Sequence, residues 1–461
     1  MAIQILPQSL MTLYAIGGCR IILNFTLQKD MTKSNLKIII IISLAFPLAS
    51  CFSTGSSKKS SVHGSMDYLT DQFLGLPAPV GPFEKPKTFT ASSQLPANVI
   101  TGANYSIQPQ VFNDGFLNIY TINSSYGNIT AVSTATLYKR VHEMKVIAEI
   151  EKMSKSGEFV DGVTEKGKDV VTGAKNAVFN PIDTVTGSIS GIGKIFNRVK
   201  ENAGNKAKSD SENLLEDASG YSKTKRDYAN ELKVDVYSRN PILQEELDNL
   251  AMAGYAGNML SALTIGNFTG PVATVTGTAN LLNKVMKDMS PPDLRIMNRE
   301  KLQKMGVPNA TADAFIKNGS YTPREQTVLV NALFEMKNTQ GRDEYIKFAT
   351  PADHYDVTYF RQLQTEMYAD HNRNNAPIKQ FRNLGPFTTA ITGDNILYVC
   401  LPMDYLLWTS GMAKAVTILT GHVNTLPWVK EKRFYLTGSL SPLARKNLTK
   451  LGWVIFDKTA T

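Results

Sequence analysis

The sequence predicts an α+β protein with a mostly helical middle, a small N-terminal β-meander and a C-terminal α/β layer with parallel strands. Three observations support this fold class. Alternating polar and apolar runs surround a turn at 113–115, apolar residues recur at helical spacing between 228 and 385, and strand-like and helix-like runs alternate after 386. The expected divisions of the chain are 1–50, 51–103, 104–155, 156–227, 228–385 and 386–461.

The β-meander is expected at the start of the third division. Runs at 105–111 and 116–122 flank Asn113-Asp114-Gly115. An Asp-Gly or Asn-Gly step between two such runs is a strong hairpin signal. A third run at 128–132 completes the antiparallel meander.

A helix is expected directly after the meander. Ser133 or Thr134 offers a side-chain oxygen to cap its first backbone amides. Spacings of three and four place four apolar side chains on one helical face, namely Leu137, Val141, Met144 and Ala148.

Residues 156–227 are expected to form an amphipathic Gly- and Lys-rich segment followed by a polar linker. Between Ile182 and Val199, apolar residues fall at alternating spacings of three and four, with lysines nearby. Such a segment can lie on a lipid surface. The alternative is helices that pack on the body or fray, because each glycine in a helix interior costs about 1 kcal/mol. The glycines are Gly187, Gly191 and Gly193.

The division 228–385 is expected to be a helical domain. Thr322, Pro323 and Glu325 have the order of a helix start, with a capping threonine, a first-turn proline and an early acid. Helices are expected at 243–263, up to 289, and at 293–305, 311–317, 323–336 and 355–372.

The last division, 386–461, alternates strands and helices. Runs at 387–391 and 396–401 predict a hairpin, and the helices between the later strands predict parallel pairing. The later elements are a helix at 404–420, a strand at 434–437, a helix at 442–450 and a strand at 453–456.

The loop 437–441 contains the candidate anion-binding residues. It joins a strand end to a helix N-terminus, where free amides and the helix dipole attract anions. The candidate ligands are Gly438, Ser439, Ser441 and Arg445. The alternative is a capped turn, with Ser441 as N-cap and Pro442 in the first turn. The loop is not G-x-S-x-G, so a hydrolase nucleophile is not indicated.

The sequence predicts no catalytic residue, no metal ligand and no cofactor. Asp353-His354 and Asp370-His371 match no recognised metal spacing. Both pairs lie at expected helix ends, where such residues serve as caps or solvated charges. Cys400 lies in an apolar run, which indicates a buried, inert thiol.

A leader precedes these elements at 31–51. Two lysines are followed by a mostly apolar run, 38–50, and by small residues before a cysteine. The run is too short for the roughly 20 apolar residues that span a bilayer, and it suits a secretory signal peptide. Its last residues, Leu48-Ala49-Ser50-Cys51, resemble the lipobox of bacterial lipoproteins.

This resemblance implies cleavage between Ser50 and Cys51 and acylation of Cys51, for example with palmitate. Two or more acyl chains give stable membrane anchoring. Residues 51–103, rich in Ser, Gly, Lys and Pro, would then be a lipidated flexible tether. In bacterial lipoproteins an Asp after the cysteine is the usual inner-membrane retention cue, so Phe52 favours the outer membrane, facing the periplasm or the surface.

Residues 1–30 fit this leader less well. Ile16-Gly17-Gly18-Cys19 is a second lipobox-like string, but no positive charge precedes it. The simplest interpretation is that translation starts at Met31 and that residues 1–30 are a mis-called start.

Composition limits the function classes. The chain carries +9, of which residues 1–50 carry +3, so that the mature chain carries about +6. Such an excess does not indicate nucleic acid as a partner, and an acidic membrane or glycan explains it as well. The sequence favours a non-enzymatic, lipid-anchored envelope scaffold or interaction protein, with the membrane and other envelope proteins as partners. The alternative is an envelope enzyme that acts on an anionic or glycan substrate at 437–441.

Overall fold

The structure is a computed structural model that describes residues 11–16, 19–24, 81–155, 221–257 and 278–459. These residues belong to two units, 1–58 and 59–461. The leader with Ser50 and Cys51, most of the expected tether and the amphipathic segment lie outside the described residues.

In the first unit, β1 (Met11–Ile16) and β2 (Cys19–Asn24) form an antiparallel hairpin. Met11 pairs with Asn24 and Ile16 with Cys19. No element was expected here, although both strands are rich in the apolar and β-branched residues that favour pairing.

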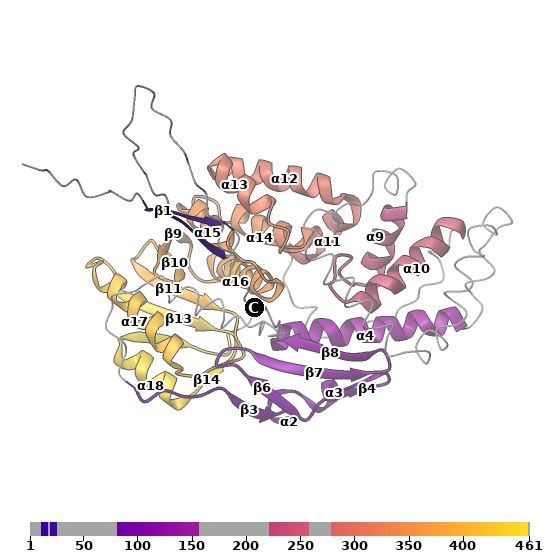
Figure 1. Ribbon diagram of the computed structural model, residues 1–461, viewed down its shortest axis with the longest axis horizontal. Coiled ribbons are helices and arrows are strands. Elements are labelled where there is room, and N and C mark those ends of the chain that lie inside the picture. Colours follow the sequence, from indigo (N-terminus) through magenta and orange to yellow (C-terminus); the bar gives the residue numbers. More distant parts are fainter. Residues whose placement is uncertain (1–10, 17–18, 25–80, 156–220, 258–277, 460–461) are drawn as a thin grey trace, which may run out of the picture. The chain divides into compact units, whose positions relative to one another are not determined.

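The second unit begins with an antiparallel sheet whose central strand is β7 (Figure 1). β8 pairs with β7 on one side, and β5 and β6 pair with successive parts of β7 on the other. The run expected at 105–111 is therefore two strands, because Pro109 has no amide hydrogen to donate to the ladder. The strands are β3 (Lys87–Thr90), β4 (Thr101–Gly102), β5 (Tyr105–Ile107), β6 (Gln110–Asn113), β7 (Asn118–Ser124) and β8 (Gly127–Val132).

The expected tether, 51–103, extends too far toward the C-terminus. Residues 87–102 form β3, two short helices and β4, and three of their side chains are buried in the core. Few apolar residues are enough to order this stretch, because β6 and β5 satisfy the backbone polar groups of β3 and β4. The short helices are α2 (Ala91–Gln94) and α3 (Ala97–Ile100), and the buried side chains are Ala91, Leu95 and Val99.

Helix α4 (Thr134–Lys155) contacts β7 and β8 and buries the four expected apolar side chains. Its start is also as expected, since the Ser133 hydroxyl accepts a hydrogen bond from the amide of Thr136 (3.1 Å). Helices α9 (Tyr221–Glu231) and α10 (Pro241–Gly257) contribute to the same core. Residues 221–227, which were expected to be linker, are helical. Their two buried residues, Ser222 and Arg226, are polar, so that an apolar pattern could not indicate this part of the helix.

Further helices follow between 278 and 374, and most of them contribute to a second core that also includes residues of the C-terminal sheet. The capping box expected at the start of α14 is present: Thr322 and Glu325 accept hydrogen bonds from each other's amides (3.1 and 2.9 Å). Helix α15 was not expected. The helices are α11 (Thr278–Asp288), α12 (Pro291–Lys304), α13 (Asn309–Ile316), α14 (Pro323–Glu335), α15 (Arg342–Ala349) and α16 (Tyr355–Asn374).

The C-terminal sheet is mixed, in the order β15-β13-β11-β10-β9. The predicted hairpin is β10–β11, and the predicted parallel pairing joins β11, β13 and β15. One face packs on α17 and α18 and the other on α15 and α16. The elements are β9 (Ile378–Leu384), β10 (Phe387–Thr392), β11 (Ile396–Leu401), α17 (Ser410–Asn424), β13 (Glu431–Leu436), α18 (Pro442–Lys450) and β15 (Trp453–Phe456).

Two expectations for this region are wrong. Strand β9 pairs with β10, so that a domain boundary at 386 would cut a hairpin. The helix expected at 404–420 begins only at Ser410, because residues before it form the short strand β12 (Tyr405–Leu406). The fold is thus α+β, with an antiparallel N-terminal and a mixed C-terminal sheet.

Candidate functional site

A segment that we call the central segment, Met403–Thr409, joins the two sheets of the second unit. Its strand β12 pairs in parallel with β14 (Ser439–Leu440), which lies in the loop 437–441. On the other side, the amide of Leu407 donates to the carbonyl of Gly115 (2.9 Å), in the turn between β6 and β7. Partners on both sides explain why this segment is extended rather than helical.

Asp404 is the carboxylate of the central segment that meets the N-terminal sheet. It accepts hydrogen bonds from the amides of Asn118 (2.8 Å) and Thr134 (3.1 Å), the latter in the first turn of α4. Burial raises the pKa of Asp404 to about 6, although both amide bonds oppose the rise, and nearby Asp114 adds to it. The central segment, which joins the two sheets, therefore contains a carboxylate whose pKa lies well above the usual value for aspartate.

The loop 437–441 is filled from within the protein. The amide of Ser439 donates to the carbonyl of Asp404 (3.0 Å), and the amide of Ser441 donates to another carbonyl of the central segment (2.9 Å). A Cβ on Gly438 would lie 1.9 Å from the carbonyl oxygen of Asp404, so that only glycine fits there. The amides of Ser439 and Ser441 are therefore not available to a ligand.

The anion at the start of α18 is the side chain of Glu84. Ser441 is the N-cap: its hydroxyl accepts from the amide of Ala444 (3.0 Å) and donates to the Glu84 carboxylate. The same carboxylate oxygen of Glu84 accepts a hydrogen bond from the backbone amide of Trp408 (2.7 Å). The backbone carbonyl of Trp408 in turn accepts a hydrogen bond from the backbone amide of Glu84 (2.9 Å). The attraction of this helix terminus for anions is met by the chain itself.

The four candidate residues therefore do not form an open anion site. Arg445 is exposed and pairs with Asp457 (2.6 Å), and Gly438 and Ser439 contact the central segment. Ser441 is completely buried, and its hydroxyl already donates and accepts one hydrogen bond. The capped turn with Pro442 in its first turn is confirmed.

The other residues considered from the sequence have structural roles. His354 is the N-cap of α16 and accepts from the amide of Asp356 (3.3 Å), as its position predicted. Asp370 bonds to Asn374 (2.8 Å) on the same helix. Cys400 is buried, and burial raises the pKa of its thiol, which agrees with an inert cysteine.

His371 was expected to be a cap or a solvated charge, and this is wrong. It is 7 % exposed, and its ring lies 4.3 Å from the ring centroid of Tyr398 and 4.6 Å from that of Tyr435. Burial, together with the positive charge of Arg433, lowers the pKa of His371 to about 4. The imidazole is therefore neutral at pH 7.

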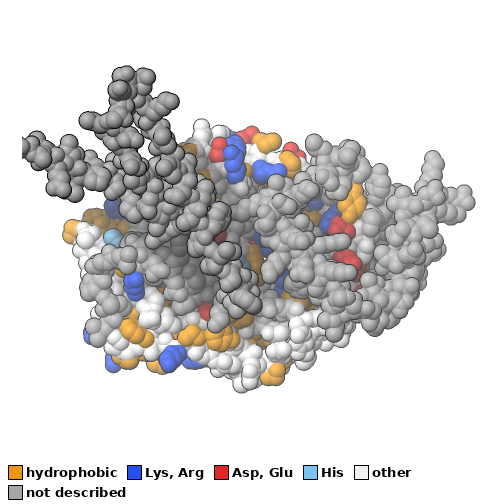
Figure 2. Space-filling model, in the orientation of Figure 1, with side chains coloured by type: hydrophobic (Ala, Val, Ile, Leu, Met, Phe, Trp, Pro, Cys, Tyr) orange, Lys and Arg blue, Asp and Glu red, His pale blue; other side chains and the backbone are white. Residues whose placement is uncertain are grey.

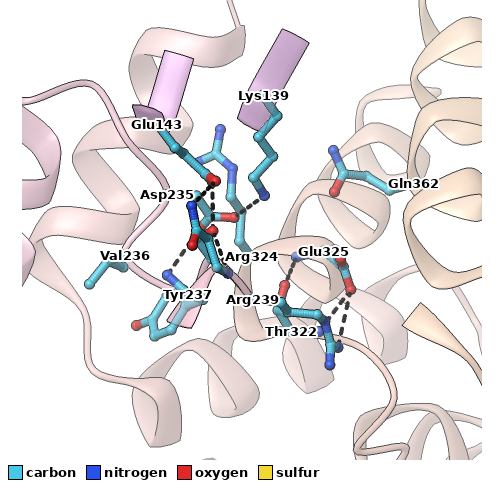
Figure 3. A network of polar contacts seen from close by, with 12 residues as sticks. Lys139, Glu143, Asp235, Val236, Tyr237, Arg239, Thr322, Arg324, Glu325 and Gln362 are labelled. Carbon is cyan, nitrogen blue, oxygen red and sulfur yellow. Dashed lines mark hydrogen bonds and ion pairs between the residues drawn. The ribbon is translucent and has the colours of Figure 1, made fainter. Parts of the chain in front are cut away.

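A buried polar network joins α4 to the loop before α10. The Glu143 carboxylate accepts from the Arg140 guanidinium (2.6 Å), the Ser238 hydroxyl (2.6 Å) and the Asn240 amide group (3.0 Å). Figure 3 shows Glu143 and Lys139 side by side on α4, both directed at this loop. Both oxygens of this buried carboxylate therefore have hydrogen-bond donors.

Lys139 extends this network toward α14. Its ammonium binds the Asp235 carboxylate (2.7 Å). Burial acts to raise the pKa of Asp235, but Lys139 and Arg324 outweigh burial and hold it below its usual range. Arg239 lies 3.9 Å from Glu325 (Figure 3). Each of the three acids of the network thus faces a cation from another part of the chain or from the same helix, and these contacts fix the helices to one another.

Sequence reasoning missed Glu84, Asp404 and this network. Each depends on residues far apart in the chain, and no local spacing marks them. The one local signal was the capping box of Thr322 and Glu325, which places Glu325 next to the network.

Two general features bear on function. Among the described residues, no group of three or more His, Cys, Asp or Glu side chains could hold a metal ion. Among the described helices, none combines the length and the apolar character needed to cross a bilayer.

No protein-family model matches the chain, and comparisons with curated proteins and with solved structures found no match. Function must therefore be inferred from the residues themselves.

Proposed function

We propose that the chain is a lipid-anchored protein of the bacterial cell envelope, whose body is a non-enzymatic scaffold or binding surface for other envelope components. The observation that carries this proposal is the leader that ends in Leu48-Ala49-Ser50-Cys51. Cys51 would be acylated after cleavage behind Ser50, and Phe52 favours the outer membrane.

The start of the folded body is consistent with an anchor ahead of it. The described body begins at Gly81 and is fixed three residues later, where Glu84 bonds to Trp408 and Ser441. Gly81 lies thirty residues after Cys51, a stretch that spans at most ~100 Å when fully extended. An anchor at Cys51 would therefore keep the body close to the membrane.

The enzyme alternative at 437–441 has little support. A substrate at this loop would need free amides or a reactive hydroxyl. The central segment binds the amides of Ser439 and Ser441, and Glu84 binds the hydroxyl of Ser441. Ser441 is enclosed, so that its hydroxyl is not placed to attack a substrate.

Fatty-acid labelling tests the anchor. The chain is produced in a bacterial host with an alkyne analogue of palmitate, as wild type, as Cys51→Ala and as Cys19→Ala. Cys19 is the matched control, because it ends the second lipobox-like string. We expect label and membrane partitioning to be lost in Cys51→Ala and kept in Cys19→Ala. Retention of both by Cys51→Ala would disprove the anchor.

Affinity purification tests the scaffold role. The acylated wild type is crosslinked in intact cells, purified and compared with Cys51→Ala. We expect envelope proteins or glycans to co-purify with the wild type at a fixed ratio and to be depleted in the variant. Purification of the acylated protein with no enriched envelope component would argue against a scaffold while leaving the anchor intact.

A further inference from the structure

Positive charge is concentrated near the C-terminus. Residues 428–459 contain seven Lys or Arg and two Asp or Glu, a net charge of +5. The whole chain carries +9 and residues 1–50 carry +3, which leaves +1 for residues 51–427. The positive charge is therefore not spread evenly over the mature chain.

Several of these cations lie at one edge of the C-terminal sheet. β13 and β15 are parallel, so that both begin at the same edge, and α18 ends there. Lys430 directly precedes β13, and Lys450 is the last residue of α18, with Lys446 one turn earlier on the same helix face. All three lysines are exposed. Together with Trp428, they form what we call the basic edge.

A contact between side chain and backbone shows that the two lysine-bearing elements meet. The Cε atom of Lys432, on β13, lies 3.2 Å from the position that a Cβ would take on Gly452, directly after α18. Lys432 also pairs with Trp453 in the strand register. Lys432 thus adds a fourth, half-buried cation at this edge.

Acidic residues neutralise little of this charge. Within the described part of the chain, no ion pair joins Lys430, Lys446 or Lys450 to a carboxylate. The two acids of the region bind other cations, Glu431 to Arg433 and Asp457 to Arg445, each at 2.6 Å. Asp394, in the turn before β11, is a single exposed acid near Lys430.

An exposed tryptophan accompanies the lysines. Trp428 is 39 % exposed, whereas Trp408 and Trp453 are 4 % and 2 % exposed. Its neighbours Leu426 and Val429 pack on the core and hold the loop in place. Figure 2 shows Lys and Arg side chains among hydrophobic ones at its lower left, where Figure 1 draws α17 and α18. Tryptophan beside lysine is typical of surfaces that bind at the headgroup level of a bilayer.

We propose that the basic edge docks on anionic phospholipid headgroups of the membrane that holds Cys51. This proposal rests on the proposed function, because the anchor supplies the proximity. Glu84 fixes the entering chain at the start of α18, and this nine-residue helix is only about 13 Å long. The chain that follows the anchor thus enters the body at the opposite end of α18 from the basic edge, about 13 Å away. Even weak docking is then favoured by the high effective concentration.

A lipid partner fits better than a nucleic acid. Both offer phosphates to the lysines, but a bilayer also offers an apolar layer beneath them for Trp428. Loss of one lysine near an anionic surface weakens binding about fivefold. Removal of three lysines is therefore expected to weaken docking by about a hundredfold.

Trp428 serves as the probe, since the other two tryptophans of the chain are buried. The acylated full chain is placed in vesicles of brominated phosphatidylcholine, alone or with 30 % phosphatidylglycerol, and tryptophan quenching is measured. We expect quenching at least twofold stronger in anionic vesicles, lost in 0.5 M salt and absent in Trp428→Phe. The basic-edge variant combines Lys430→Gln, Lys446→Gln and Lys450→Gln. In anionic vesicles, its tryptophan fluorescence should be quenched only as much as that of wild type in neutral vesicles.

The matched control removes three exposed lysines elsewhere, by Lys304→Gln, Lys317→Gln and Lys337→Gln. It should behave as wild type. Equal quenching in neutral and anionic vesicles, or an unaffected basic-edge variant, would overturn the docking proposal. So would lysine-dependent binding to RNA or DNA without quenching by lipid. Failure of the anchor is seen separately, as loss of the chain from neutral vesicles.

Discussion

The carboxylate of Glu84 accepts a hydrogen bond from the hydroxyl of Ser441, which lies 357 residues later in the chain. The hydroxyl also caps α18. The contact therefore fixes the start of the described body to the helix that borders the C-terminal sheet. A charged acceptor strengthens such a bond.

The first prediction concerns the energetic coupling of this pair. Ser441→Ala removes the N-cap and one donor of Glu84, and should lower the free energy of unfolding by ~2–3 kcal/mol. Glu84→Gln should cost ~1 kcal/mol, because it removes the charge. The double variant should show a coupling of ~1–2 kcal/mol in urea unfolding.

Ser290 provides the control for this cycle. It caps α12 in the same way, through the amide of Asp293, and its hydroxyl donates to the carboxylate of Asp293 rather than to Glu84. Ser290→Ala combined with Glu84→Gln should be additive within ~0.5 kcal/mol. Additive behaviour of Glu84→Gln with Ser441→Ala would contradict the bond.

A second prediction concerns Gly438. A Cβ there would meet the backbone of Asp404 at 1.9 Å, so Gly438→Ala must displace the central segment. We expect a loss of at least about 3 kcal/mol in thermal or urea unfolding. Gly421→Ala is the control, because no atom lies within 4 Å of its Cβ position in α17. It should stabilise by ~0.5–1 kcal/mol, as alanine replaces glycine in a helix. Equal effects of the two changes would refute the close contact.

Local elements were predictable where the pattern was local. The helix Pro442–Lys450 and the strand Trp453–Phe456 have the predicted bounds, because a serine cap, a first-turn proline and a terminal glycine mark them. The capping box at Thr322 and Glu325 was predicted for the same reason.

Elements defined by distant partners were not predictable. The central segment has a helix-compatible composition but is extended, since β14 on one side and the turn at Gly115 on the other supply its hydrogen bonds. The sequence indicated that the helix start at Ser441 could attract an anion or be a simple capped turn, but not that Glu84 would lie there. No local spacing carries that information.

A third prediction tests the buried polar network. Glu143→Ala leaves the Arg140 guanidinium, which is 8 % exposed, without its carboxylate. We expect a loss of ~3–5 kcal/mol, the usual cost of a buried charge that loses its partner. Glu149→Ala is the control, since Glu149 and Lys152 form an exposed pair on the same helix. It should change the free energy of unfolding by less than about 0.5 kcal/mol. A small effect of Glu143→Ala in urea unfolding would show that the network is open to water.

A fourth prediction follows from Asp404. Its pKa is raised to about 6 in the folded state, so between pH 4 and 6 the folded state holds a proton that the unfolded state has lost. The free energy of unfolding therefore falls as pH rises through this range, by up to ~3 kcal/mol. Asp404→Asn removes this dependence. Between pH 4 and 6, the free energy of unfolding of the variant should therefore rise by that amount relative to that of wild type. A difference that is constant with pH, measured by urea unfolding, would contradict the raised pKa.

A fifth prediction has the opposite sign and concerns His371. Its pKa is lowered to about 4 in the folded state. As pH falls from 6.5 to 4, His371 is therefore protonated in the unfolded state but stays largely neutral in the folded state. The free energy of unfolding should fall over this range by ~2 kcal/mol. His371→Phe keeps a flat ring between Tyr398 and Tyr435 and should abolish this loss, whereas His422→Phe, at an exposed position, should not. Asp404 and His371 act in opposite directions between pH 4 and 6, so their contributions to the wild-type profile partly cancel. Each single variant should reveal the slope of the other residue, and a wild-type profile that both variants merely shift in parallel would refute both assignments.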